Sequence, residues 1–198
     1  MQLRAPAILI AARPHGETAV IARMLTEAHG VVAAYVAGGR GRQLRPVVIP
    51  GNIVEAEIRA KSDSQLPFAR LELSQSRGPW LSEPLPAAAI AWICAITASA
   101  LPERNPYPRL YQALSALLDA VCNAPSARGW APALASYEVL LLRDLGYGGS
   151  KPSIDSLDDA LEILRANEGL IARYLLADTR ADVLAARQLL MQRLERMV

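Results

Sequence analysis

Two segments in the first half of the chain alternate strictly between apolar and polar residues. In "NIVEAEIRAK" (52–61), Val54, Ala56 and Ile58 face one way and the charged residues between them face the other. "FARLELS" (68–74) repeats the pattern, and the polar stretch "SDSQLP" separates the two segments. A period of two with a turn between the runs predicts a β-hairpin with one buried face.

Three further apolar runs upstream predict strands at residues 7–13, 19–26 and 31–38, separated by "PHGET" and "EAHG". Five short strands without a helical pattern favour a small closed barrel. The OB-fold has this number of strands, and an SH3-like barrel is the nearest alternative.

The pattern changes near residue 80, where the proline-rich linker 78–86 ("GPWLSEPLP") precedes segments with helical spacing. One helix is predicted from Pro86 to about Leu101. A second carries an apolar stripe at Leu110, Leu114, Leu117, Leu118 and Val121. We therefore predict an α+β protein with two domains, an OB-fold barrel at 1–79 and an all-α helical domain at 80–198.

Three later helices are predicted within the second domain. The segment around 134–145 is apolar nearly all round and is predicted to be a central buried helix closed by Gly146. Ser156 with Asp159, and Thr179 with Asp182, have the spacing of capping boxes, which satisfy backbone N–H groups at the start of a helix.

Composition supports folded domains and excludes a membrane span. The 198 residues are 52% hydrophobic and 20% charged. The longest uncharged apolar stretch, 87–101, is shorter than the roughly 20 residues that a membrane-spanning helix needs. Cys94 and Cys122 lie in apolar helical runs, which fits a reducing cytoplasm rather than a disulfide framework. The expectation is a cytoplasmic protein.

The sequence contains no convincing catalytic, metal or cofactor motif. His15 and His29 are the only histidines and both lie in predicted turns, where exposure to solvent explains them. Neither cysteine has a second ligand at metal-binding spacing. "GGRGR" opens no predicted helix and lacks the lysine of a phosphate-binding loop. We predict no enzyme activity, no cofactor and no metal site.

Positive charge is concentrated in the first domain. Residues 1–79 hold ten basic against six acidic residues, whereas residues 80–198 hold eleven against thirteen. Arg40, Arg42 and Arg45 cluster in the glycine-rich segment "VAGGRGRQLRPVVIPG" (36–51). They are either a solvated loop that discourages aggregation or a groove for the phosphates of a nucleic acid. Further candidate DNA contacts are Arg13, Arg23, Arg59, Lys61, Arg70 and Arg77.

The order of these parts resembles the RecO family of DNA repair and recombination proteins. The resemblance rests on "RPHGETAVIARMLTEAHGVVAAYVAGGRGR", followed later by "NPYPRLYQALSALLDAV" and "YEVLLLRDLGYG". It implies an N-terminal OB-fold, a C-terminal helical domain, and a basic segment that maps onto Arg40 and Arg42, with Arg45 just beyond it.

The resemblance also implies a function. RecO proteins bind single- and double-stranded DNA, anneal complementary strands, work with RecR, and help to exchange single-stranded-DNA-binding protein for RecA. We expect a bacterial, nucleoid-associated mediator that acts on DNA in this way and reaches RecA indirectly. The alternatives are a protein–protein adaptor and an OB-fold protein that binds RNA, neither with annealing activity.

The chain departs from the family at a zinc site. Many RecO proteins carry four zinc-binding cysteines after the helix that corresponds to "YEVLLLRDLGYG", but here that stretch reads "GYGGSKPSIDSLDD". Zinc dependence is therefore not expected.

A partner surface is also expected by resemblance, because RecO helical domains can dock the acidic tail of single-stranded-DNA-binding protein. The candidate residues are Arg109 and Arg143. The alternative for Arg143 is that it pairs with Glu138 or near Asp144, or extends into water.

Overall fold

The computed structural model describes residues 2–60, 62, 65–149, 152–177 and 181–197. The chain forms two compact units, one of Met1–Ser82 with Leu101–Tyr111 and one of Glu83–Ala100 with Gln112–Val198. The segment 101–111 is thus grouped with the strands, whereas the sequence pattern predicts that it belongs to the helical domain.

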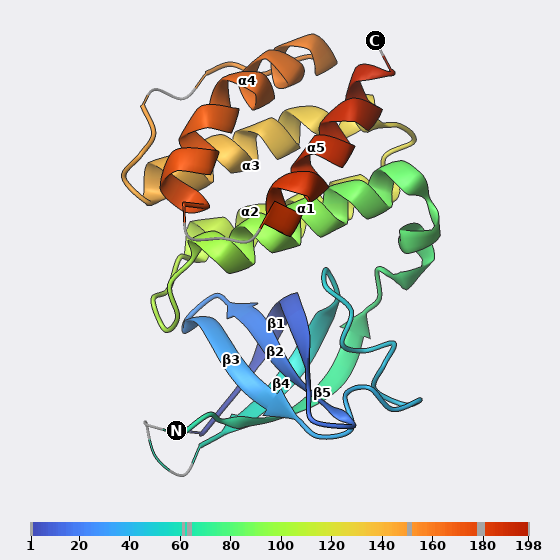
Figure 1. The fold of residues 1–198 in the computed structure, drawn as a ribbon, viewed down its shortest axis with the longest axis vertical. Helices are drawn as coiled ribbons and strands as arrows, with labels where there is room; N and C mark the ends of the chain where they lie inside the picture. Colours follow the sequence, from blue (N-terminus) through green and yellow to red (C-terminus); the bar gives the residue numbers. More distant parts are fainter. Residues whose placement is uncertain (1, 61, 63–64, 150–151, 178–180, 198) are drawn as a thin grey trace. The chain divides into compact units, whose positions relative to one another are not determined.

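The first unit is a closed barrel, shown in Figure 1. Its strands among the described residues are β1 (Gln2–His15), β2 (Ala19–Thr26), β3 (Gly30–Val36), β4 (Ile53–Arg59) and β5 (Phe68–Gln75). The order around the barrel is β1-β2-β3-β5-β4, with β4 pairing back to β1 and β3 parallel to β5. The predicted five-stranded OB-fold barrel is confirmed.

Alternation of side chains explains how the barrel fills its interior. Val54, Ala56 and Ile58 of β4 are fully buried, as the sequence pattern predicts. β1 is longer than its predicted range because it serves two partners: residues 2–8 pair with β4 and residues 7–15 pair with β2. A register shift between Leu9 and Ala11 marks an irregularity in the β1–β2 pairing, which bends a strand.

The segment 101–111 is attached to β3 by backbone contacts. The N–H of Arg104 donates to the carbonyl oxygen of Val31 at 2.9 Å, and Val31 forms a parallel bridge with Glu103. Gly30 has a φ of +66°, and a Cβ at this position would lie 2.1 Å from the carbonyl oxygen of Asn105. Only glycine therefore allows this close approach.

The second unit contains the helices (Figure 1), among them α1 (Pro84–Ala100), α2 (Pro108–Asn123), α3 (Ala131–Asp144), α4 (Leu157–Leu170) and α5 (Ala181–Glu195). The first residues of α2 are grouped with the barrel. α3 packs against α4, and α1 packs against α5. A π-helical turn, Ile171–Leu175, continues α4.

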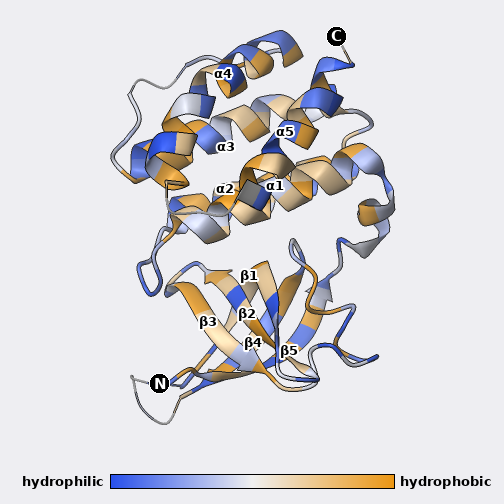
Figure 2. Ribbon diagram, viewed as in Figure 1, coloured by the Kyte–Doolittle hydropathy of each residue, from blue (hydrophilic) through white to orange (hydrophobic). Residues whose placement is uncertain are grey.

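The helical patterns agree with the structure where the residues are described. The apolar stripe of α2 is buried along its whole length, and Gly146 follows α3 with a φ of +86°. Figure 2 shows hydrophobic and hydrophilic residues mixed along α4 and α5. The capping box of Ser156 and Asp159 is present, whereas Thr179 lies outside the described residues. Among the described residues, no helix combines the length and apolar character needed to cross a membrane.

Candidate nucleic-acid interface

The glycine-rich segment between β3 and β4 is fixed to the barrel at its first end. Gly38 turns the chain with a φ of +67°. Gly39 is buried against the barrel, and a Cβ there would lie 2.6 Å from a methyl group of Val20. The N–H of Arg40 then donates to the carbonyl oxygen of Thr18 at 2.8 Å. The glycines therefore hold the segment close to the barrel, in addition to letting it turn.

The far end of the segment is fixed by Asn52, which is fully buried. Its side-chain amide donates to the carbonyl oxygens of Pro46 and Val47 at 2.9 and 3.0 Å. Its side-chain oxygen accepts from the N–H of Arg77 at 2.7 Å. Val47 and Val48 are buried in the barrel core. Sequence reasoning missed Asn52, because nothing in its neighbours along the chain indicates this role.

Arg40, Arg42 and Arg45 are all exposed on this anchored segment. The guanidinium of Arg40 also donates through Nη1 to the carbonyl oxygens of Gly16 and Glu17, at 3.4 and 3.1 Å. Arg40 thereby joins the segment to the β1–β2 turn. A guanidinium has five N–H donors, so this contact is compatible with binding a phosphate. Substitution of Arg42 and Arg45 therefore tests the effect of charge without breaking the contact that Arg40 makes with the β1–β2 turn.

Three of the predicted strand arginines are exposed on the outer surface of the barrel: Arg13, Arg59 and Arg70. Arg59 forms an ion pair with Glu57, and Arg70 stands opposite Glu57 in the β4–β5 register. Ion pairing on a solvated surface contributes little to stability. Arg59 can therefore exchange its carboxylate partner for a phosphate.

Two other candidates are engaged within the first unit. Arg23 is partly buried and pairs with Glu103 at 2.5 Å, across to the segment 101–111. Arg77 is fully buried. Burial leaves the Arg77 side chain without the exposed surface that the predicted phosphate contact needs. Lys61 lies outside the described residues.

The two partner-binding candidates lie in different units. Arg109 is exposed and belongs to the first unit, whereas Arg143 is exposed on α3 of the second. Glu138 pairs with Arg187 at 3.1 Å, so the alternative that Arg143 pairs with Glu138 is wrong. The exposure of Arg143 agrees with its extending into water.

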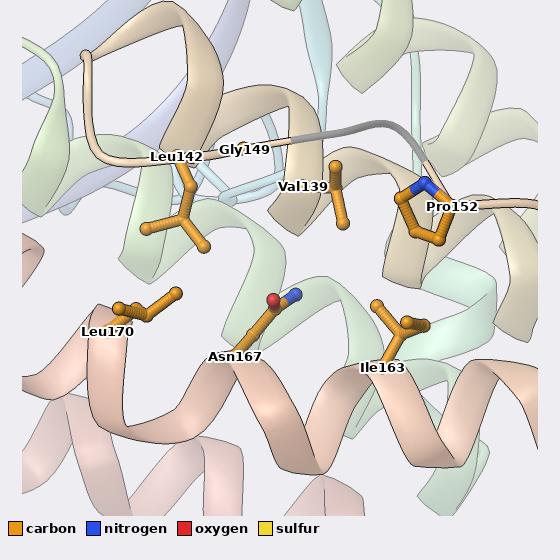
Figure 3. Close-up of a pocket in the computed structure, with 8 residues that line it drawn as sticks. Val139, Leu142, Gly149, Pro152, Ile163, Asn167 and Leu170 are labelled. Atoms are coloured by element: carbon orange, nitrogen blue, oxygen red, sulfur yellow. The ribbon is translucent and has the colours of Figure 1, made fainter.

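A pocket of about 200 Å³ opens near Arg143 in the second unit (Figure 3). Its wall includes Val139 and Leu142 from α3, Ile163, Asn167 and Leu170 from α4, and Gly148, Gly149 and Pro152 from the connection between them. A Cβ at Gly148 would lie 2.6 Å from Cγ of Arg143. An arginine therefore lies next to a residue of the rim of a mostly apolar pocket.

No cluster of three potential metal ligands occurs among the residues that the structure describes. Cys94 and Cys122 are both buried. Metal-independent folding stays a prediction.

Family models match both units of the chain. The model described as "Recombination protein O N terminal" matches residues 1–77, and "Recombination protein O C terminal" matches residues 82–150.

Similar bacterial proteins bear the name "DNA repair protein RecO". That of Rhodospirillum centenum is 43% identical over 143 residues, which are 72% of this chain and 56% of the relative. That of Phenylobacterium zucineum is 39% identical and that of Caulobacter vibrioides 38% identical, each over 149 residues, 75% of this chain and 60% of the relative. The chain thus spans less than two thirds of the length of these curated relatives.

Proposed function

Because the chain belongs to the RecO family, we propose that it acts in DNA repair and homologous recombination as a non-enzymatic mediator. In this role it binds single- and double-stranded DNA without sequence specificity. The observation that carries the proposal is the anchored segment of the barrel on which Arg40, Arg42 and Arg45 are exposed.

The arrangement suits phosphates better than base edges. Arg42 and Arg45 stand on an irregular segment rather than on a helix or ribbon that could enter the major groove. Arginines in such a position meet the backbone of either form of DNA, and the release of counterions supplies the affinity. Binding is then independent of sequence and strongly dependent on salt.

The further steps of the proposed role follow from the family. The protein anneals complementary strands, works with RecR, and assists the loading of RecA in place of single-stranded-DNA-binding protein. Its place of action is the bacterial cytoplasm at the nucleoid.

The test is a salt series of oligonucleotide binding with the double variant Arg42→Ala/Arg45→Ala. Each phosphate contact to a single strand contributes about 0.7 to the slope of log affinity against log salt, so the double variant lowers the slope by about 1.4. Arg165→Ala is the matched control, because Arg165 is an exposed arginine of the second unit that pairs with Glu195. An unchanged slope in the double variant would show that the segment is a solvated loop whose arginines do not contact phosphates.

The same series separates the alternatives. Wild-type protein that binds neither DNA nor RNA would support the protein–protein adaptor. Preference for RNA over DNA of the same sequence would support an RNA-binding role. Strand annealing, followed by the pairing of two complementary labelled strands, distinguishes the mediator from both.

The pocket beside Arg143 supports a second part of the proposal. We infer that it receives the acidic, carboxylate-ended tail of single-stranded-DNA-binding protein. Apolar side chains of Val139, Leu142 and Leu170 provide a site for an aromatic residue, and Arg143, which adjoins Gly148 of the pocket wall, provides a charge for a carboxylate.

A tail peptide titrated into the full chain tests this part. We expect Leu170→Glu to abolish binding, because it places a carboxylate in an apolar wall that faces an acidic ligand. Arg143→Ala weakens binding, and Arg165→Ala leaves it unchanged. If the wild type does not bind the peptide, the pocket has another role. If only Arg143→Ala is silent, Arg143 alone is removed from the site.

A further inference from the structure

A row of outward-facing residues crosses all five strands of the barrel. Arg13 stands opposite Ile21 in the β1–β2 register, and Ile21 stands opposite Tyr35 in the β2–β3 register. Tyr35 then pairs with Phe68 of β5, and Phe68 with Arg59 of β4. The row therefore places two aromatic side chains between two arginines that are far apart in the sequence.

The aromatic side chains of this row touch one another. Tyr35 and Phe68 meet edge to face with ring centroids 5.2 Å apart. His15, at the end of β1, meets Tyr35 in the same manner at 5.8 Å. Three rings thus form a continuous cluster on the surface of β1, β3 and β5.

Phe68 is the only phenylalanine of the chain, and 62% of its surface is exposed. A large apolar side chain gains free energy when it is buried, and β5 directs Ala69, not Phe68, into the barrel. Within the described part of the chain, Phe68 contacts Tyr35 but keeps most of its surface exposed. An exposed aromatic residue in a cluster, unlike a lone surface leucine, indicates a binding surface.

A pocket of about 310 Å³ adjoins Phe68. Its wall includes two guanidinium groups, from Arg59 and Arg70, and one carboxylate, from Glu57. Glu57 is already paired with Arg59, so the pocket as a whole favours an anion. Its volume is near the lower limit of about 300 Å³ for small-molecule sites.

We propose that His15, Tyr35 and Phe68 form a base-stacking subsite for single-stranded DNA, with Arg59, Arg70 and Arg13 facing the flanking phosphates. The proposal rests on the function proposed above and assigns to this surface a part that the loop arginines cannot perform. Tyr35 stands on β3, and the face of strands 2 and 3 is the usual ligand surface of an OB-fold. Aromatic rings beside arginines bind unstacked bases without reading their sequence.

The subsite distinguishes single strands from duplexes. Both faces of a base inside a duplex are already stacked on neighbouring pairs, so the base cannot lie against Phe68 unless it leaves the helix. The loop arginines make no such distinction, because phosphates are present in both forms. Preference for single strands is therefore expected to depend on the aromatic cluster.

The test compares Phe68→Leu with wild type in the full-length chain, since leucine keeps an apolar side chain but removes the aromatic face. Leu73→Ala is the matched control, because Leu73 is an exposed apolar residue on the same strand, 38% exposed. Affinities for a single strand and for the duplex of the same sequence are measured at one salt concentration. The single strand carries 2-aminopurine, whose fluorescence reports stacking.

We expect Phe68→Leu to weaken binding of the single strand by roughly 5- to 150-fold, the effect of losing one stacked base. Affinity for the duplex and the salt slope stay unchanged, and the fluorescence change on binding is reduced. Equal weakening for both forms, or no weakening for the single strand, would overturn the subsite. In either case the salt response of the loop variant still tests the proposed function. Wild-type protein that binds no DNA would overturn both.

Discussion

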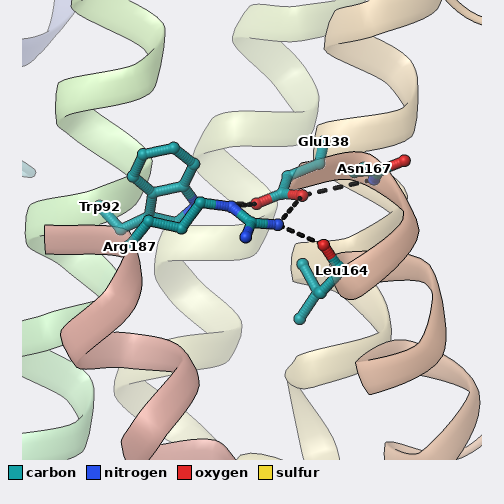
Figure 4. A network of polar contacts seen from close by, with 5 residues as sticks. All are labelled: Trp92, Glu138, Leu164, Asn167 and Arg187. Carbon is teal, nitrogen blue, oxygen red and sulfur yellow. Dashed lines mark hydrogen bonds and ion pairs between the residues drawn. The ribbon is translucent and has the colours of Figure 1, made fainter. Parts of the chain in front are cut away.

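Arg187 of α5 and Glu138 of α3 form an ion pair inside the helical unit, with Nη2 and Oε2 3.1 Å apart and side chains only 4% and 1% exposed. Figure 4 shows that further polar groups complete the site. Trp92 of α1 and Asn167 of α4 donate to the same carboxylate at 2.9 and 3.3 Å. Arg187 also donates to the carbonyl oxygen of Leu164. One carboxylate therefore connects four helices.

We expect Arg187→Met to destabilise the protein by about 3–5 kcal/mol, because it leaves the carboxylate buried without its counter-charge. Burial already raises the pKa of Glu138, and Arg187 opposes that rise. Without Arg187 the folded-state pKa rises further. The stability contribution of such a group is present below its unfolded pKa, about 4.3, and is lost as the pH rises through its folded value. The penalty is therefore smaller near about pH 4.5 than near about pH 7.5.

Urea unfolding of the variants at the two pH values measures this penalty. The double variant Glu138→Gln/Arg187→Met provides the control, since a neutral amide oxygen still accepts from Trp92 and needs no counter-charge. It should lose less stability than Arg187→Met alone. Equal or additive losses would contradict the account of a buried charge.

Asn52 is the second residue whose removal has a specific expected effect. Asn52→Ala leaves the N–H of Arg77 and the carbonyl oxygens of Pro46 and Val47 without their partner. Buried polar groups left in this state cost about 1–3 kcal/mol. The segment that carries Arg42 and Arg45 also loses one of its anchors, so trypsin should cleave the Arg42–Gln43 bond faster than in the wild type, whereas the Arg45–Pro46 bond resists trypsin in both proteins.

Limited proteolysis and urea unfolding provide the two measurements. Asn123→Ala is the control, because Asn123 is an exposed asparagine whose amide donates to the carbonyl oxygen of Asp119. It should change neither result. If cleavage in Asn52→Ala is unaltered, the contacts of Gly39 and Arg40 at the first end of the segment are sufficient to hold it.

Local patterns predicted β4 and α2 well because each of these two elements has one face to bury. The alternation in 52–61 gave β4, and the spacing of the leucines gave α2. The start of β1 was missed, since residues 2–6 become a strand by pairing with β4, far along the chain.

The candidate site was predicted less completely, because its contacts join distant residues. Asn52 and Arg77 are 25 positions apart, and Tyr35 meets Phe68 only through the parallel pairing of β3 with β5. Arginine is usually a surface residue, and the sequence around Arg77 does not indicate that its side chain is buried. Neither pairing nor burial of this kind leaves a periodic signal in the sequence.

Gly30 and Gly16 provide a matched pair of substitutions. Both have positive φ, +66° and +61°. Alanine in this conformation costs about 1–2 kcal/mol. A Cβ at Gly16 meets nothing within 4 Å, whereas a Cβ at Gly30 collides with the backbone of Asn105.

We expect Gly30→Ala to destabilise the protein by clearly more than Gly16→Ala, the difference being the cost of moving the segment 101–111 away from β3. Thermal unfolding of the two variants gives the comparison. Hydrogen exchange at the N–H of Arg104, which donates to Val31, should quicken only in Gly30→Ala. If the two variants lose similar stability and show similar hydrogen exchange, moving the segment 101–111 away from β3 costs no free energy.

The start of α4 is a capping box with a carboxylate that titrates at low pH. The hydroxyl oxygen of Ser156 accepts from the N–H of Asp159 at 3.1 Å, and the carboxylate of Asp159 accepts from the N–H groups of Ser156 and Asp155 at 3.0 and 3.2 Å. The side-chain hydroxyl of Ser156 first, and then the N–H groups of Asp155 and Ser156, lower the pKa of Asp159 below its ordinary value of 3.8.

A lowered folded-state pKa means that Asp159 contributes stability above its unfolded pKa and loses that contribution as the pH falls through the folded value. We therefore expect wild type to be more stable than Asp159→Asn at neutral pH and the difference to shrink below about pH 3.9. Ser156→Ala, which removes the reciprocal bond, costs about 1 kcal/mol at neutral pH. Urea unfolding followed across the pH range measures both, with Asp158→Asn on the same helical turn as the control. A difference that stayed constant down to the lowest pH would show that the carboxylate's charge has no part in the cap.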